Sequence, residues 1–147
     1  MNAAVLDASV ALRWILEDEA DREGALRIRA ALEEGRLLAD APPTFLPEVA
    51  GALTRAVRAG RMTAAAAFAS LDGLSRVGVD TPELHAFVQD SMRIAMRTGI
   101  QVQDATYIRT AQRLGVPLVS ADRAQLAAAA AVAVVAVPLA SVPPFEP

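Results

Sequence analysis

The chain of 147 residues contains no cysteine, no lysine and a single histidine, and only 4% of its residues are aromatic. Without cysteine, a disulfide framework, a zinc-thiolate site and a cysteine nucleophile are all excluded. A Ser-His-Asp hydrolase would depend on His85, and no Gly-x-Ser-x-Gly motif precedes a helical pattern. Because 54% of the residues are hydrophobic but few are rings, the core must consist mainly of Ala, Val and Leu.

Targeting and membrane-spanning patterns are also lacking. The first ten residues, MNAAVLDASV, have no basic region followed by an apolar stretch, so they do not form a signal-peptide pattern. The apolar run Leu126–Val137 is too short to span a bilayer. We therefore expect a soluble, cytoplasmic protein with no membrane segment and, at this length, a single domain over residues 1–147.

Arginine supplies all fourteen basic residues, and the formal net charge is −3. Arginine is suited to bidentate phosphate contacts, although a complete lack of lysine also fits the coding bias of a GC-rich genome. The acidic total does not exclude a nucleic-acid substrate, because a bound metal ion would offset acidic charge locally.

Short apolar runs alternate with segments of helical periodicity along the chain. The predicted strands are Ala3–Leu6, Leu37–Ala39, Val77–Val79, Pro117–Ser120 and Val132–Val137. The predicted helices are Ser9–Glu17, Ala20–Glu34, Glu48–Ala59, a segment capped by Thr63 that runs to Leu74, Glu83–Thr98, Asp104–Leu114 and Arg123–Ala129, with a proline-punctuated tail after Pro138. This alternation predicts an α/β fold with a parallel sheet of four to five short strands and helices on both faces.

Four acidic residues stand where a predicted strand ends or a predicted helix begins: Asp7, Glu48, Asp104 and Asp122. Ligands of such sheets bind beyond the carboxyl ends of the strands, and hard cations prefer oxygen ligands. The pattern indicates a site for Mg²⁺ or Mn²⁺ and a substrate that carries phosphate. Each aspartate has an alternative role as a helix N-cap, and the helix dipole favours a first-turn glutamate, so capping and metal binding can coexist.

Three blocks carry a family resemblance in their order and spacing. They are VLDASVALRWIL at Val5–Leu16, LPEVAGAL at Leu46–Leu53 and VQDATYIRTAQRLGVPLVSADR at Val102–Arg123. Together they resemble the blocks of PIN-domain proteins and, more narrowly, those of the toxin ribonucleases of bacterial VapBC toxin-antitoxin pairs.

The resemblance implies a role for each matched residue. Asp7, Glu48 and Asp104 would be the core catalytic, metal-binding acids, and Asp122 would complete the cluster or hold a metal-bound water, with Ser9 and Ser120 as supporting hydroxyls. It also implies a Mg²⁺- or Mn²⁺-dependent endoribonuclease that leaves 5′-phosphate and 3′-hydroxyl ends. Such a toxin would be neutralised by a cognate antitoxin and would form a homodimer.

The arginines leave alternatives open. Arg13 and Arg123 adjoin acid-bearing segments and are candidates for RNA or antitoxin contact, yet charge balance beside carboxylates explains them equally. Arg55, Arg58 and Arg61 form a basic cluster that could face RNA, a partner or solvent. Two other functions remain: a PIN-type nuclease in RNA processing or decay outside a toxin pair, and a metal-binding interaction module without turnover.

Overall fold

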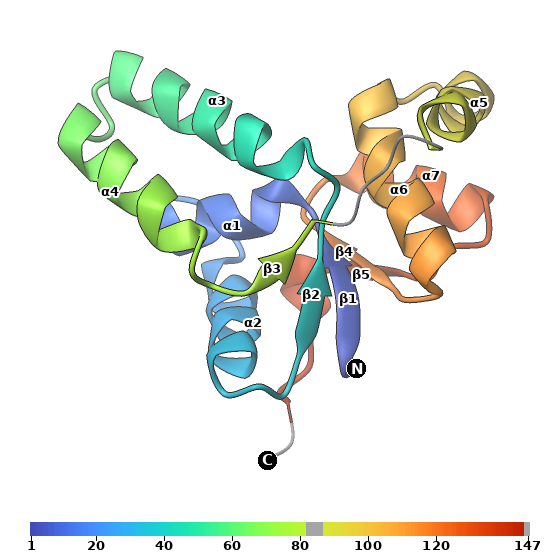
Figure 1. The fold of residues 1–147 in the computed structure, drawn as a ribbon, viewed down its shortest axis with the longest axis horizontal. Helices are drawn as coiled ribbons and strands as arrows, with labels where there is room; N and C mark the ends of the chain where they lie inside the picture. The colour runs from blue at the N-terminus through green and yellow to red at the C-terminus, as the bar shows by residue number, and fades with distance from the viewer. Residues whose placement is uncertain (82–86, 146–147) are drawn as a thin grey trace.

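The computed structural model describes residues 1–81 and 87–145, and these form a parallel five-stranded sheet with helices on both faces (Figure 1). All neighbouring strands pair in parallel, in the order β3-β2-β1-β4-β5. The α/β fold predicted from the alternation is thus confirmed. The strands are β1 (Ala3–Leu6), β2 (Leu38–Asp40), β3 (Val79–Asp80), β4 (Leu118–Ser120) and β5 (Ala136–Pro138).

The strand order reverses at β1, in the centre of the sheet. The chain moves from β1 outward through β2 to β3, then returns to the other side of β1 and continues outward through β4 to β5. Val5 lies opposite Asp40 of β2 on one side and opposite Leu118 of β4 on the other. In open parallel sheets a ligand site forms beyond the carboxyl ends of the strands at such a reversal. Here that place is where the neighbouring strands β1 and β4 end, and we call it the β1/β4 edge.

Seven α-helices and one short 3-10 helix lie in the described ranges. The α-helices α1 to α4 cover one side of the sheet, and α5 to α7 cover the other (Figure 1). Their bounds are α1 (Ala8–Ile15), α2 (Arg22–Glu33), α3 (Phe45–Arg58), α4 (Ala64–Leu74), α5 (Val88–Thr98), α6 (Val102–Leu114) and α7 (Arg123–Ala131), followed by the 3-10 helix η1 (Leu139–Ser141). None of the helices within 1–81 and 87–145 combines the length and apolarity that a membrane span requires.

Small and aliphatic side chains fill the core, as the composition predicts. Val5 and Leu6 of the central strand are fully buried, as is Ile28 of α2. The single tryptophan, Trp14, is also in the core, where its indole Nε1 donates a hydrogen bond to the backbone carbonyl of Ala25 at 2.6 Å. This bond ties α1 to α2.

The helix boundaries agree with the sequence pattern where local signals are strong. Thr63 caps α4 as predicted, and its Oγ1 accepts a hydrogen bond from the backbone N–H of Ala66 at 3.1 Å. Helix α3 begins at Phe45, earlier than predicted, so Glu48 lies within its first turn and does not open it. The predicted helix Glu83–Thr98 is observed from Val88 onward, and its first residues lie outside the described ranges.

The prediction of a strand over Val132–Val137 is wrong in extent. Helix α7 continues to Ala131, and its end is closed by a left-handed residue, Ala133, with a φ of 61°. The N–H of Val134 donates to the carbonyl of Ala129 at 2.9 Å, and the N–H of Ala133 donates to the carbonyl of Ala130 at 3.1 Å. This pair of bonds is a Schellman motif, which occupies Val132–Val134 and delays the strand to Ala136.

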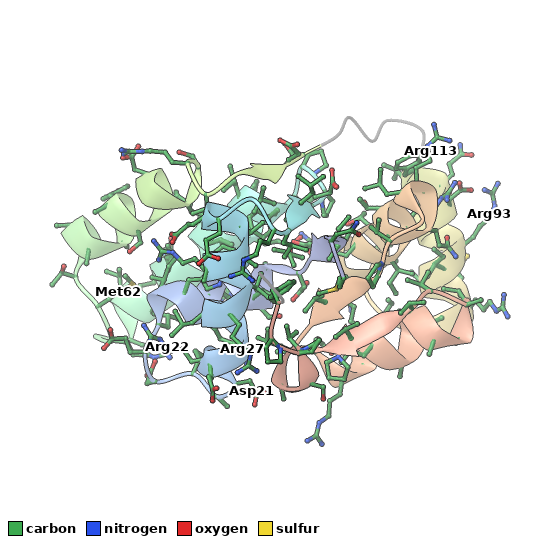
Figure 2. All side chains as sticks on the ribbon, turned by 90° about the horizontal axis from the view of Figure 1, so that it is seen from below. Asp21, Arg22, Arg27, Met62, Arg93 and Arg113 are labelled. Carbon is green, nitrogen blue, oxygen red and sulfur yellow. The ribbon has the colours of Figure 1, made fainter. Side chains whose placement is uncertain are left out.

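The predicted C-terminal tail is docked against α2. Gly24 of α2 contacts the backbone of η1 so closely that an added Cβ would lie 2.2 Å from the carbonyl oxygen of Leu139. Arg27 donates to the carbonyl of Val142 at 3.0 Å, and Figure 2 shows Arg27 beside this segment. Arg36 donates to the carbonyl of Phe145 at 2.7 Å. The segment after Pro138 is therefore part of the fold.

Candidate metal centre

Asp7 follows β1 directly and caps the N-terminus of α1. Its backbone is extended, and its Oδ2 accepts a hydrogen bond from the backbone N–H of Ser9 at 2.9 Å. An aspartate at this position partners an N–H group that the first helical turn leaves free. The residue is only 7% exposed, so its carboxylate belongs to the interior edge of the site.

Asp122 occupies the corresponding position after β4. Its Oδ1 accepts hydrogen bonds from the backbone N–H groups of Ala124 at 2.7 Å and Gln125 at 3.1 Å, and so caps α7. In contrast to Asp7, Asp122 is exposed. The capping role that the sequence leaves open is therefore present for both aspartates, together with their placement at the β1/β4 edge.

Two serine hydroxyls accept hydrogen bonds from the loop that carries Asp122. The Oγ of Ser120 accepts a hydrogen bond from the backbone N–H of Asp122 at 2.9 Å. The Oγ of Ser9 accepts one from the backbone N–H of Ala121 at 3.1 Å, across from the β1 side to the β4 side. The Ser9 hydroxyl therefore joins the two loops, whereas the Ser120 hydroxyl shapes only the loop that carries Asp122.

Glu48 and Asp104 reach the same region from the first turns of α3 and α6. The phenol of Tyr107, which is fully buried, donates a hydrogen bond to Oε2 of Glu48 at 3.1 Å. The other carboxylate oxygen of Glu48, Oε1, is buried and has no hydrogen-bond partner among the described residues. A buried carboxylate oxygen without a donor is costly, because it has lost its hydration without replacement.

Burial and neighbouring negative charge both disfavour ionisation of Glu48 and Asp104. Burial raises the pKa of Glu48 above its ordinary value of 4.5, the nearby hydroxyls of Thr44 and Tyr107 partly oppose this, and the negative charges of Asp7 and Asp104 raise the pKa further. Burial also raises the pKa of Asp104 above 3.8, and there the additional charges are those of Asp122 and Asp7. The charges of Asp7 and Asp122 therefore act on Asp104, and those of Asp7 and Asp104 act on Glu48.

A cleft of about 440 Å³ opens beside these groups between α3 and the start of α6. Glu48 and Asp104 contribute to its wall, and so does the guanidinium-bearing residue Arg55. The complete lining is Ala8, Leu12, Pro47, Glu48, Gly51, Ala52, Arg55, Gln101, Gln103 and Asp104. The cleft gives an extended ligand access to two of the four acids.

A divalent cation fits the chemistry of this donor set, although the set is not preassembled. The ligands are carboxylate oxygens, which Mg²⁺ and Mn²⁺ prefer, and Oε1 of Glu48 lacks a donor. Within residues 1–81 and 87–145, no three acidic or histidine side chains are close enough to form a ready coordination group. Ion binding at this site would therefore require a further carboxylate to approach, as rotation of the Glu48 side chain toward Asp7 and Asp104 would provide.

The PIN domain family matches residues 4–131, a stretch that contains all four acids. The chain belongs to this family. The resemblance of the three sequence blocks to PIN-domain proteins is thereby confirmed.

This PIN domain is similar to two curated relatives and to a solved structure. It is 34% identical over 118 residues to Ribonuclease VapC3 of Mycobacterium tuberculosis strains CDC 1551 / Oshkosh and ATCC 25618 / H37Rv, covering 80% of this chain and 81% of each relative. The crystal structure of PAE2754 from Pyrobaculum aerophilum matches with a TM-score of 0.72 and 22% identity, over 94% of this chain and 90% of that chain. At that identity the structural match supports the fold alone.

Two residues of the PIN-domain site were not singled out from the sequence. Tyr107 contacts Glu48, and Gln125 donates through Nε2 to Oδ1 of Asp7 at 3.2 Å and to the backbone carbonyl of Asp104 at 3.3 Å. Each lies three residues after a predicted acid, on the same face of its helix. That spacing was a usable signal, although the contact partners are far away in the sequence.

The candidate arginines occupy different environments. Arg13 donates to the carbonyls of Ala20 at 2.6 Å and Ser9 at 2.9 Å, so its guanidinium supports the end of α1. Arg123 is exposed, next to Asp122 at the start of α7.

The predicted basic cluster on and just past α3 is spread over three surfaces of this PIN domain. Arg55 lines the acid-bearing cleft, and Arg58 lines a separate apolar groove between α3 and α4. Arg61 pairs with Asp18 at 2.6 Å and with Glu19 at 2.8 Å. Only Arg55 therefore shares a surface with the acids.

Proposed function

We propose that this PIN domain is an endoribonuclease that depends on Mg²⁺ or Mn²⁺ and acts as a toxin neutralised by a cognate antitoxin. The observation that carries the proposal is the meeting of Asp7, Glu48, Asp104 and Asp122, from four separate segments, at the reversal point of the sheet. The name of the curated relatives, Ribonuclease VapC3, supports RNA as the substrate and the toxin role. A toxin that cuts cellular RNA would act in the cytoplasm.

Asp7, Glu48 and Asp104 are the proposed ligands of the ion, and Asp122 completes the negative cluster. When bound, a divalent ion would supply positive charge that stabilises a phosphodiester undergoing in-line displacement by water. The raised pKa values of Glu48 and Asp104 mean that protons compete with the cation for these carboxylates. Cation binding would offset both the desolvation of the buried carboxylates and the repulsion between neighbouring ones.

The remaining site residues hold these acids in place. Tyr107 anchors one oxygen of Glu48 and leaves Oε1 as the oxygen without a protein donor. The N–H of Ser9, at the positive end of α1, anchors Oδ2 of Asp7. Ser9 ties the two aspartate loops together, and Ser120 shapes the loop that carries Asp122.

RNA would enter along the cleft beside Glu48 and Asp104. Arg55 in the cleft wall and Arg123 beside Asp122 are placed to contact phosphate, whereas Arg13 is already bonded to backbone carbonyls. We also propose a homodimer, as the VapBC resemblance implies.

The test is cleavage of structured and single-stranded RNA by the purified protein, with Mn²⁺ and with EDTA. We expect cleavage in Mn²⁺, 5′-phosphate ends, and loss of cleavage in EDTA. Asp7→Asn and Asp104→Asn should each lower the rate by at least about 100-fold, since each removes a charged ligand. Both variants should retain the circular dichroism spectrum of the parent protein.

Parental cleavage rates in either variant would remove that residue from the site. Equal cleavage in EDTA and in Mn²⁺ would overturn the proposal of metal dependence. Mn²⁺ binding without cleavage of any RNA would instead favour an interaction module.

A further inference from the structure

Gln125 is a buried polar residue that contacts the segments of two acids. It is 1% exposed, and its Nε2 bridges Oδ1 of Asp7, at 3.2 Å, and the backbone carbonyl of Asp104, at 3.3 Å. Its own backbone N–H donates to Oδ1 of Asp122 at 3.1 Å. One residue thus connects the β1–α1 loop, the first turn of α6 and the cap of α7.

The helix end explains why this side chain is available for the bridge. Asp122 and Gln125 have the spacing of a capping box, in which the Gln side chain would reach back to the N–H of Asp122. Here that N–H donates to Oγ of Ser120 at 2.9 Å. The side-chain amide of Gln125 is therefore not needed for capping and bonds to the neighbouring segments instead.

The bridge completes the hydrogen bonding of Asp7. Oδ2 of Asp7 accepts from the N–H of Ser9, and Oδ1 accepts from Gln125, so both oxygens are held without a cation. Because the second bond of Gln125 goes to the backbone of Asp104, the same amide sets the distance between the first and third acids.

A purely structural role explains Gln125 poorly. Its Oε1 is buried and has no hydrogen-bond partner among the described residues. Burying an amide with one end unpaired is unfavourable, and an apolar side chain of similar volume would fill the position without that loss. Departures of this kind from good packing are expected at functional sites.

We propose that Gln125 is a positioning residue that orients Asp7 and holds it at a fixed distance from Asp104, and thereby raises the affinity of the site for a divalent cation. The inference rests on the proposed metal-dependent function. Groups that orient metal ligands typically change metal affinity or activity by about 10–100-fold when they are removed.

The test is isothermal titration of the full chain with MnCl₂, comparing Gln125→Met with the parent. Methionine keeps the volume and removes the donor. We expect the Kd for Mn²⁺ to rise by about 10-fold or more. The matched control is Gln112→Met, because Nε2 of Gln112 donates to the carbonyl of Val132 at 3.2 Å, an exposed bond of α6 outside the site. The control should bind Mn²⁺ like the parent.

Kinetics separate positioning from general damage to the fold. In Gln125→Met, excess Mn²⁺ should restore kcat toward the parental value, and KM for RNA should stay unchanged throughout. A fall in kcat that Mn²⁺ does not restore, or a parental Kd for Mn²⁺, would overturn the inference.

A measurement on the parent protein covers the case in which Gln125→Met does not fold. The side-chain amide resonances of Gln125, assigned by NMR, should shift on titration with Mg²⁺ with the same midpoint as the backbone resonances of Asp7 and Asp104. Amide resonances of Gln125 that do not respond, while those of Asp7 and Asp104 do, would overturn the inference alone. A parent protein that binds neither Mg²⁺ nor Mn²⁺ would overturn the proposed function and this inference together.

Discussion

At the scale of single residues, the acids of this PIN domain differ in how well their oxygens are satisfied. Both oxygens of Asp7 accept hydrogen bonds, whereas Glu48 keeps one buried oxygen without a partner among the described residues. Burial, followed by the charges of Asp7 and Asp104, raises the pKa of Glu48. The ionised form of Glu48 is therefore disfavoured in the metal-free fold, as expected where stability is exchanged for a functional charge.

We predict that Glu48→Gln stabilises the metal-free protein. The pKa of Glu48 in the folded protein lies above 4.5, its value in the unfolded chain. The contribution of Glu48 to the free energy of unfolding is therefore fully present below pH 4.5 and is lost as the pH rises through the folded-state pKa. Glutamine does not titrate, and its amide oxygen can still accept from Tyr107. In EDTA at pH 7.5, Glu48→Gln should melt about 2–4 °C above the parent, which corresponds to about 1 kcal/mol in a domain of this size.

The pH dependence supplies the check on this prediction. The gap in Tm between Glu48→Gln and the parent should shrink as the pH falls toward 4 and should also close when saturating Mn²⁺ stabilises the parent. A variant that melts below the parent at pH 7.5 in EDTA would show that the ionised carboxylate is stabilising, contrary to this account.

At the scale of elements, helix ends carry both the stability and the site. Helices α1 and α7 are capped by Asp7 and Asp122, and α7 ends in a Schellman motif with alanine at the left-handed position. A left-handed conformation costs an L-residue with a Cβ about 1–2 kcal/mol, which glycine avoids. The end of α7 is therefore a place where the fold is locally strained.

We predict that Ala133→Gly stabilises the protein by about 0.5–1 kcal/mol, since relief of the left-handed strain exceeds the added entropy of glycine in the unfolded chain. The measurement is urea unfolding monitored by circular dichroism. Ala127→Gly, at an exposed position within α7, is the control and should destabilise by up to about 1 kcal/mol. Equal destabilisation by both changes would rule out strain at Ala133.

Helix α3 and the turn just after it carry three arginines, Arg55, Arg58 and Arg61, whose surroundings predict different contributions to RNA binding. Arg55 lines the acid-bearing cleft, and Arg61 is held by Asp18 and Glu19. We predict that Arg55→Ala raises KM for RNA by about 3–10-fold and leaves kcat nearly unchanged. The dependence of KM on salt concentration should weaken by the amount expected for the loss of about one phosphate contact. The matched change Arg61→Ala should leave KM at the parental value. If Arg61→Ala raised KM as much as Arg55→Ala, a diffuse electrostatic effect would explain the result better than contact within the cleft.

At the scale of the whole molecule, the sequence predicts what local chemistry determines. The strand at Ala3–Leu6, the cap at Thr63 and the parallel sheet follow from apolar periodicity and capping residues, which act over a few positions. The placement of the acids at strand ends and helix starts also predicts their convergence, because the carboxyl ends of parallel strands meet at one edge.

The contacts between distant segments could not be predicted in this way. Gln125 contacts Asp7, which is 118 positions away in the sequence, and Arg36 contacts Phe145, which is 109 positions away. Neither contact produces a periodic pattern in the sequence. The end of α7 also differs from the prediction, because the β-branched residues after Ala131 favour a strand and the closing bonds of the Schellman motif override that preference.

The most direct test of the account is an anomalous difference map at the manganese edge from crystals soaked in MnCl₂. The account predicts a peak between the carboxylates of Asp7, Glu48 and Asp104, with Oε1 of Glu48 turned toward it, and no peak there in crystals of Asp104→Asn. A fully occupied manganese peak elsewhere on the molecule, with these carboxylates unmoved, would contradict it.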